Sequence, residues 1–144
     1  MNPIIIQLYN DYLLQLKRGN YKGLVSNAKP IALLSIIAAI SNSAVKENKI
    51  LFDNLISYYK EVNRKYGIIR VTPLSYPFYH LATEPFYHLM WKVKPIKRDA
   101  PPAKFIRDNI EYAYLDEELW DLLQVEEIRE QFKTIIEDYY LSEQ

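Results

Sequence analysis

The spacing of apolar residues predicts helices at both ends of the chain. From Pro3 to about residue 18, apolar side chains recur every three or four positions, which places them on one face of a helix, and Gly19 follows as a stop signal. The same spacing returns in the C-terminal part of the chain. It predicts three further helices, over residues 103–110, 116–123 and 126–141.

Two more helices are predicted in the middle of the chain. Pro30 opens a run, residues 31–40, that is apolar on nearly every face, so we expect this helix to form the centre of the core. Asp53 is a plausible N-cap for the next helix, which has one apolar face and ends at Gly67. Residues 68–71 are β-branched in part and favour a strand or an extended link.

Residues 72–98 break this helical pattern. Four prolines in this stretch forbid a continuous helix, and the aromatic residues between them suit short strands. The pentapeptide Pro-Phe-Tyr-His-Leu occurs twice, at 77–81 and 85–89, with a turn expected between the copies. We therefore expect paired strands at about 78–82 and 86–93. The predicted fold is mainly α (α+β), a compact helical domain with a small two-stranded β element.

Composition indicates one soluble domain spanning residues 1–144. A chain of 144 residues with 49% hydrophobic residues can bury a single core. The absence of cysteine excludes disulfides and thiolate chemistry and suggests a reducing, intracellular setting. The N-terminus lacks the features of a signal peptide. The longest apolar stretch, residues 30–40, is much shorter than the roughly 20 residues of a membrane span. We expect a cytoplasmic protein that does not contact membranes.

Charge is distributed unevenly although the formal net charge is zero. Residues 1–110 carry 16 Lys/Arg and 7 Asp/Glu, whereas residues 111–144 carry 2 and 11. A basic body with an acidic tail suggests nucleic-acid contact on one side of the molecule. The alternative interpretation is that the acidic C-terminal helices complement the basic body within the fold.

No catalytic motif is recognisable in the chain. The sequence has no P-loop, no dinucleotide-binding glycine pattern and no nucleophile elbow. The only histidines, His80 and His88, lack a nearby pair of carboxylates with which to bind a metal ion. The acidic residues of the last helices lie in their first turns, where they favour the helix dipole. We therefore predict no enzymatic activity, no cofactor and no metal.

Basic residues lie close to aromatic ones in three places, at residues 17–22, 64–66 and 91–98, and the third cluster directly follows the predicted strands. Four cations follow Trp91, in a pattern typical either of phosphate contact beside a planar ring or of a solvated loop. We take them as candidate DNA contacts: Lys92, Lys94, Lys97 and Arg98.

Three segments resemble a known family when they are taken together. Ala28-Lys29-Pro30 opens the apolar helix, the segment 76–81 reads Tyr-Pro-Phe-Tyr-His-Leu, and the segment 110–120 reads Ile-Glu-Tyr-Ala-Tyr-Leu-Asp-Glu-Glu-Leu-Trp. In this order they are similar to the sulfur-binding domain that precedes the nuclease in HNH-type, modification-dependent restriction endonucleases. The resemblance covers about residues 10–141.

The resemblance implies recognition of double-stranded DNA in which sulfur replaces a non-bridging phosphate oxygen. It places Tyr76 and Pro77 in the wall of the sulfur pocket, with His80 close by, and Lys29 at the family's basic position. Ala28 departs from the His or polar residue that often precedes that position. The chain also lacks the residues of an HNH nuclease, so we expect cleavage in a restriction-modification system to come from a separate nuclease subunit.

Two other functions stay open at this point. The first is a protein-interaction or regulatory module that keeps the fold without DNA binding and uses the acidic tail as its contact face. The second is a metal-dependent nuclease, which would need a cluster of carboxylates beside His80 and His88. Convergence of Lys29, Tyr76, Pro77 and the basic run 92–98 on one surface would favour DNA recognition.

Overall fold

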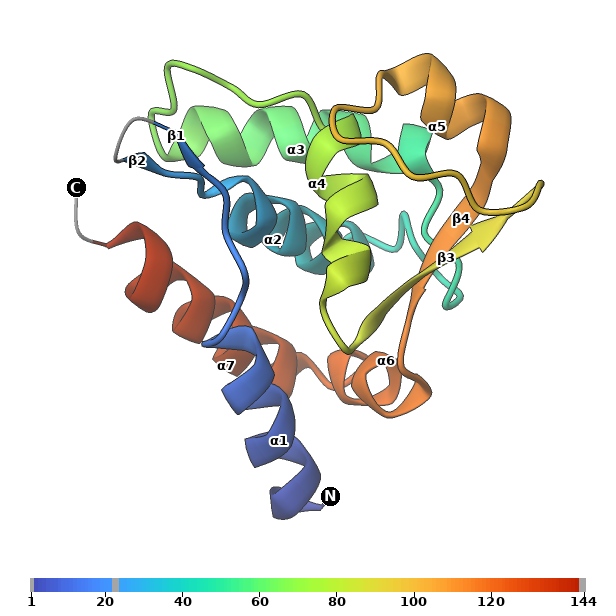
Figure 1. Cartoon of the computed structure of the whole chain (residues 1–144). Helices are drawn as coiled ribbons and strands as arrows, with labels where there is room; N and C mark the ends of the chain where they lie inside the picture. The colour runs from blue at the N-terminus through green and yellow to red at the C-terminus, as the bar shows by residue number, and fades with distance from the viewer. Residues whose placement is uncertain (1, 22–23, 143–144) are drawn as a thin grey trace.

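The computed structural model describes residues 2–21 and 24–142, and within them the chain is mainly helical (Figure 1). The helices are α1 (Pro3–Leu13), α2 (Ala28–Ser41), α3 (Phe52–Lys65), α4 (Ser75–His80), α5 (Ala103–Asn109), α6 (Glu117–Leu123) and α7 (Glu126–Ile136). A 3-10 turn, η1 (Leu81–Thr83), follows α4, and a π-helical turn, η2 (Glu137–Leu141), extends α7. The predicted class, helical with a small β element, is confirmed.

Helix α2 is the centre of the core, as its apolar sequence predicts. It packs against α3, α4 and α7, and all but a few of its side chains are buried (Figure 1). Ser35 is fully buried, but its hydroxyl donates a hydrogen bond of 2.7 Å to the carbonyl of Ile31. The helix therefore buries a polar group without leaving it unpaired. No helix in the described part of the chain is long and apolar enough to cross a membrane.

The main sheet pairs strands that are distant in the sequence. β3 (Tyr87–Trp91) runs antiparallel to β4 (Ile110–Leu115), and Ile50 forms an isolated bridge to Ala113 on the other side of β4. The first half of the chain adds a short hairpin, β1 (Asn20–Tyr21) with β2 (Leu24–Val25). The sequence did not predict β1, β2 or β4.

The predicted pairing of 78–82 with 86–93 is wrong, because residues 75–80 form helix α4. Pro77 lies in the first turn of this helix, where a missing backbone N–H removes no helical hydrogen bond. The N–H groups of Tyr76 and Phe78 bond to the carbonyls of Pro73 and Leu74. Only the second copy of the pentapeptide enters a strand, and its partner is β4.

Helix boundaries also differ from prediction in two places, and the first of them matters for the site. Helix α1 ends at Leu13 rather than near residue 18, so residues 14–19 form a separate segment, here called the linker. Helix α3 begins at Phe52, which places Asp53 in its first turn rather than at the N-cap. It closes near Gly67, whose φ of 64° lies in the left-handed region that favours glycine. Residues 68–71 form no strand.

Candidate nucleic-acid interface

Helix α4 presents three of the predicted site residues together. Tyr76 and His80 are one helical turn apart and half-buried, and Pro77 lies buried next to Tyr76. Phe78 points the other way and is 1% exposed in the core. The core therefore fixes the helix through Phe78, while Tyr76 and His80 lie on the opposite face.

This face of α4 lines an open pocket of about 570 Å³, here called the α4 pocket. Its remaining walls come from the linker, the start of α2 and the segments on either side of α4. The lining residues are Lys17, Arg18, Gly19, Ser26, Ala28, Lys29, Thr72, Tyr76, Pro77, His80 and Thr83. The structure thus brings the four predicted residues Lys29, Tyr76, Pro77 and His80 into one pocket.

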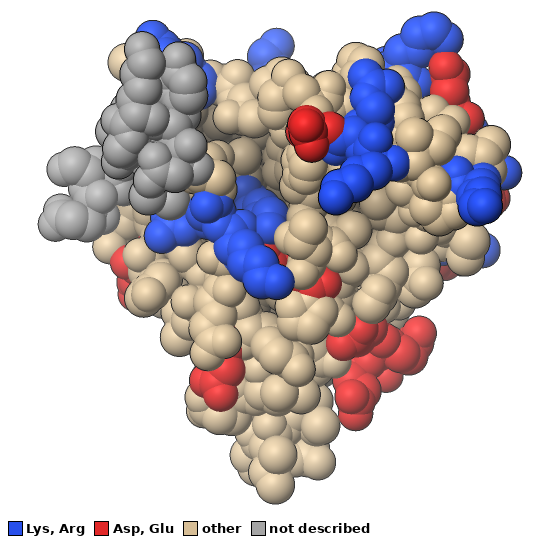
Figure 2. Space-filling view, in the orientation of Figure 1, with Lys and Arg blue, Asp and Glu red and all other residues tan. Residues whose placement is uncertain are grey.

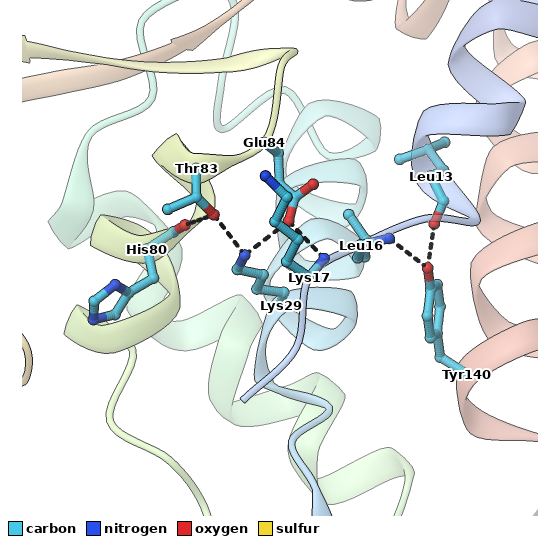
Figure 3. A network of polar contacts seen from close by, with 8 residues as sticks. All are labelled: Leu13, Leu16, Lys17, Lys29, His80, Thr83, Glu84 and Tyr140. Carbon is cyan, nitrogen blue, oxygen red and sulfur yellow. Dashed lines mark hydrogen bonds and ion pairs between the residues drawn. The ribbon is translucent and has the colours of Figure 1, made fainter. Parts of the chain in front are cut away.

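Lys29 reaches this pocket but its ammonium is already paired. Its Nζ atom lies 2.7 Å from Oε2 of Glu84 and donates to the hydroxyl of Thr83 at 2.9 Å. The two charged side chains are 11% and 2% exposed. Oε2 of Glu84 also accepts a hydrogen bond of 2.9 Å from the backbone N–H of Lys17 (Figure 3). Glu84 therefore joins the linker to the start of α2.

The linker is also fixed from the C-terminal side. The hydroxyl of Tyr140 donates to the carbonyl of Leu13 at 2.5 Å and accepts from the backbone N–H of Leu16 at 3.2 Å (Figure 3). Burial raises the pKa of Tyr140, so this hydroxyl stays protonated and able to donate. The guanidinium of Arg18 lies 4.7 Å from the centre of the Tyr140 ring and bonds to the side chain of Asn27. These contacts direct Arg18 to the pocket.

Lys17 and Arg18 belong to one of the basic clusters near aromatic residues in the sequence but were not among the candidate DNA contacts. The predicted first helix ran to about residue 18 and included both residues, so their position relative to α4 could not be inferred. The available signal was the end of the apolar spacing at Leu16, just before two cations and Gly19.

A second pocket of about 490 Å³, here called the loop pocket, adjoins the first and shares His80 and Thr83 with it. Lys97 and Arg98 line it, together with aromatic side chains of α4 and of the β3–β4 sheet. The other two predicted cations lie elsewhere. Lys92 donates to the carbonyl of Arg107, Lys94 is exposed, and neither lines the α4 pocket or the loop pocket.

Helix α4 also holds the loop that carries Lys97 and Arg98. The hydroxyl of Tyr79 donates to the carbonyl of Ile96 at 2.9 Å and accepts from the backbone N–H of Arg98 at 3.1 Å. Nε2 of His80 lies 2.6 Å from the carbonyl oxygen of Asp99, so this nitrogen carries the hydrogen and donates it. His80 therefore has a structural partner as well as a place in both pockets.

A third pocket, of about 630 Å³, lies beside the α4 pocket and shares five lining residues with it, among them Tyr76 and Thr72. Arg70 lines this third pocket and was not predicted as a contact. Figure 2 shows the Lys and Arg side chains of this face in its upper and middle part, around a hollow and with some Asp and Glu side chains among them, whereas the charged side chains lower down are Asp and Glu. Positive charge is therefore concentrated around the hollow.

The second histidine has a different environment. Nε2 of His88 lies 2.7 Å from Oδ1 of Asp116, whose Oδ2 accepts a hydrogen bond of 2.8 Å from the hydroxyl of Tyr9. Burial and the neighbouring Asp116 raise the pKa of Tyr9. Among residues 2–21 and 24–142, no group of three or more His, Asp or Glu side chains is arranged to hold a metal ion.

Comparison of the sequence with known protein families and with curated proteins finds no match.

Proposed function

We propose that this chain is a DNA-binding module that recognises a phosphorothioate in the DNA backbone, and that a separate nuclease performs any cleavage. The observation that carries the proposal is the convergence of Tyr76, Pro77 and His80 with Lys17 and Arg18 in one open pocket. These residues come from segments more than fifty positions apart. The family resemblance described above supports the same assignment for Tyr76, Pro77 and His80.

The chemistry of the α4 pocket suits sulfur better than oxygen. Sulfur is larger and more polarizable than oxygen and is a poorer hydrogen-bond acceptor, so it loses less when it leaves water. The ring of Pro77 and the methyl group of Ala28 supply apolar contacts for such an atom. The positive charges of Lys17 and Arg18 neutralise the negative charge of the same phosphate. The counterions that the phosphate held are then released, which favours binding at low salt.

The neighbouring pockets extend the surface along a DNA strand. Arg70 lines the pocket on one side of the α4 pocket, and Lys97 and Arg98 line the pocket that shares His80 and Thr83 with it. A strand held at the α4 pocket would place adjacent phosphates near these cations. Contacts between cations and phosphates fix the position and orientation of a protein on the duplex and do not depend directly on base sequence.

The experiment compares binding to two duplexes that differ only in a single phosphorothioate. We expect the modified duplex to bind at least about tenfold more tightly, a difference of roughly 1.4 kcal/mol. In R18A, binding to both duplexes should weaken, and the slope of log K against log salt should fall by about one unit. K133A is the matched control, because Lys133 lines a pocket between α3 and α7 instead. Equal binding of the wild type to both duplexes would refute the proposal.

A protein-interaction or regulatory module without DNA binding is the second candidate. One observation favours it: Lys29, the cation at the family's basic position, is engaged by Glu84 inside the fold. On this alternative the acidic C-terminal helices supply the contact face. Absence of salt-dependent binding to either duplex would support the alternative over DNA recognition.

A further inference from the structure

Glu84 is a buried carboxylate that bonds to two residues of the α4 pocket. The residue is 3% exposed and is not among the residues that line the pocket. Its Oε2 atom holds the Nζ of Lys29 and the backbone N–H of Lys17, two groups that belong to pocket-lining residues (Figure 3). Glu84 is therefore linked to the pocket through its hydrogen bonds to Lys17 and Lys29.

The carboxylate changes the charge that a ligand meets in the pocket. Lys29 supplies three N–H donors, of which Glu84 and Thr83 take two. The negative charge of Glu84, 2.7 Å away, balances the positive charge of Lys29, so the pair is close to neutral for a third group. The other two cations that line the pocket are Lys17 and Arg18 on the linker, and neither forms an ion pair with a carboxylate among the residues that the structure describes.

A neutralised ammonium affects oxygen and sulfur differently. A phosphate oxygen is strongly hydrated, and transfer into a pocket is costly unless protein donors replace its water. Sulfur binds water more weakly and needs less replacement. A pocket in which Lys29 is engaged therefore penalises the oxygen of an ordinary phosphate more than the sulfur of a phosphorothioate.

We infer that Glu84 is a positioning residue that sets the preference for sulfur over oxygen by holding Lys29 in the ion pair. The inference rests on the function proposed above. On this inference, Glu84 contributes to specificity by weakening the binding of ordinary phosphate. This effect adds to any contact that favours the phosphorothioate. If Glu84 had only a structural role, its removal would change the affinity for both kinds of DNA by the same factor.

The test is the substitution E84Q, which keeps the shape of the side chain and an oxygen that can accept from Lys17 and Lys29. We expect E84Q to bind unmodified duplex about tenfold more tightly than the wild type, because the charge of Lys29 is no longer balanced. Binding of the matched phosphorothioate duplex should rise less, so the ratio of the two affinities should fall several-fold. Both affinities are measured by fluorescence anisotropy at the same salt concentration.

E61Q is the matched control for the change in net charge. Glu61 pairs with Arg64 at the surface of α3, and both side chains are mostly exposed. Water and salt screen this position, so the affinities for both duplexes should change by the same small factor. A fall in the affinity ratio in E84Q but not in E61Q supports the inference.

A double variant covers the case in which E84Q fails to fold with Lys29 unpaired. K29M/E84M replaces the buried pair with apolar side chains, a change that folded proteins often tolerate. We expect it to bind unmodified duplex more weakly than the wild type and to prefer the phosphorothioate more strongly. Loss of the preference in K29M/E84M would overturn the inference, since it would mean that Lys29 itself selects sulfur.

The two proposals fail in different ways. Equal affinity of the wild type for both duplexes refutes phosphorothioate recognition as such. A wild type that prefers the modified duplex, together with an unchanged affinity ratio in folded E84Q, refutes only the role of Glu84.

Discussion

The pentapeptide Pro-Phe-Tyr-His-Leu adopts two different structures in this molecule. At 77–81 it forms most of α4 and the start of η1, whereas at 85–89 it leads into β3. The phenylalanine is buried in both copies, with Phe78 1% and Phe86 0% exposed. The same residues thus serve the same core from two kinds of secondary structure.

The surroundings of each copy account for the difference. In the first copy, Pro77 is preceded by residues that already form a helical turn, with the N–H of Phe78 bonded to the carbonyl of Leu74. In the second copy, β4 offers a partner, and Tyr87 pairs with Leu115. Tertiary contacts decide between helix and strand when the local preference is weak.

The two copies also have different tasks in the site. His80 of the first copy lies in the α4 pocket and holds the carbonyl of Asp99, while His88 of the second copy pairs with Asp116. A hydrogen bond links the copies, because the hydroxyl of Tyr87 donates to the carbonyl of Phe78 at 2.6 Å. The second copy therefore supports the helix that forms the pocket wall.

The largest expected effect is a loss of stability, and it should be similar in size for the two copies of the pentapeptide. F78A and F86A each remove a fully buried ring, and each should lower the free energy of unfolding by about 3–5 kcal/mol. Urea denaturation followed by circular dichroism measures both values. If one of the two variants lost much less stability than the other, the view that both rings belong to one core would be contradicted.

The next largest effect should distinguish the tyrosines of the two copies, Tyr87 and Tyr79, by how much stability each hydroxyl contributes. Y87F leaves the buried carbonyl of Phe78 without its donor and should cost about 1–3 kcal/mol of stability. Y79F is the matched control: it loses the more exposed bonds to Ile96 and Arg98, so it should cost less and weaken DNA binding instead. Equal losses of stability in Y87F and Y79F would contradict this distinction.

The Y87F variant also gives a signature in pH. Burial raises the pKa of Tyr87 well above its ordinary value of 10.0, so the phenol stays neutral in the folded state. The unfolded phenol ionises near pH 10, which favours unfolding as the pH rises further. The contribution of Tyr87 is therefore complete below about pH 10 and is lost above it. Wild-type stability should fall more steeply than that of Y87F in this alkaline range.

The pattern of apolar residues was sufficient to predict that the longer helices exist, but not to predict α4 or the sheet. Helix α2 is apolar on almost every side, and α7 carries one regular apolar face. The residues of each helix therefore predict that helix without information from distant parts of the chain. The partner of β3 is β4, residues 110–115. The order of residues within 72–98 could not predict this pairing, because the partner lies outside that range. The sequence therefore predicted a two-stranded β element in which one strand, β3, lies within the predicted range 86–93 and the partner strand was wrong.

The site was predictable only in part for the same reason. Tyr76, Pro77 and His80 are close in sequence and lie on one helix, and the resemblance pointed to them together. The pairing of Lys29 with Glu84 spans fifty-five positions and could not be read from spacing. The place of Arg18 depends on Tyr140, which lies at the other end of the chain.

The smallest expected effect concerns the two prolines and tests whether only the first copy recognises DNA. P77A removes part of the apolar wall of the α4 pocket but suits a helix, so the fold should persist. Loss of one or two methylene contacts should reduce the preference for phosphorothioate by about 1 kcal/mol, roughly five- to tenfold. The ratio of affinities for the two matched duplexes measures this effect.

P85A is the matched control in the second copy. Pro85 is exposed and lines none of the three adjoining pockets, so its removal should leave the affinity ratio unchanged. A fall of the ratio in P77A alone would locate recognition on α4, because the two prolines have the same four residues after them and differ in their surroundings. Equal effects of P77A and P85A would mean that neither proline contacts the modified phosphate directly.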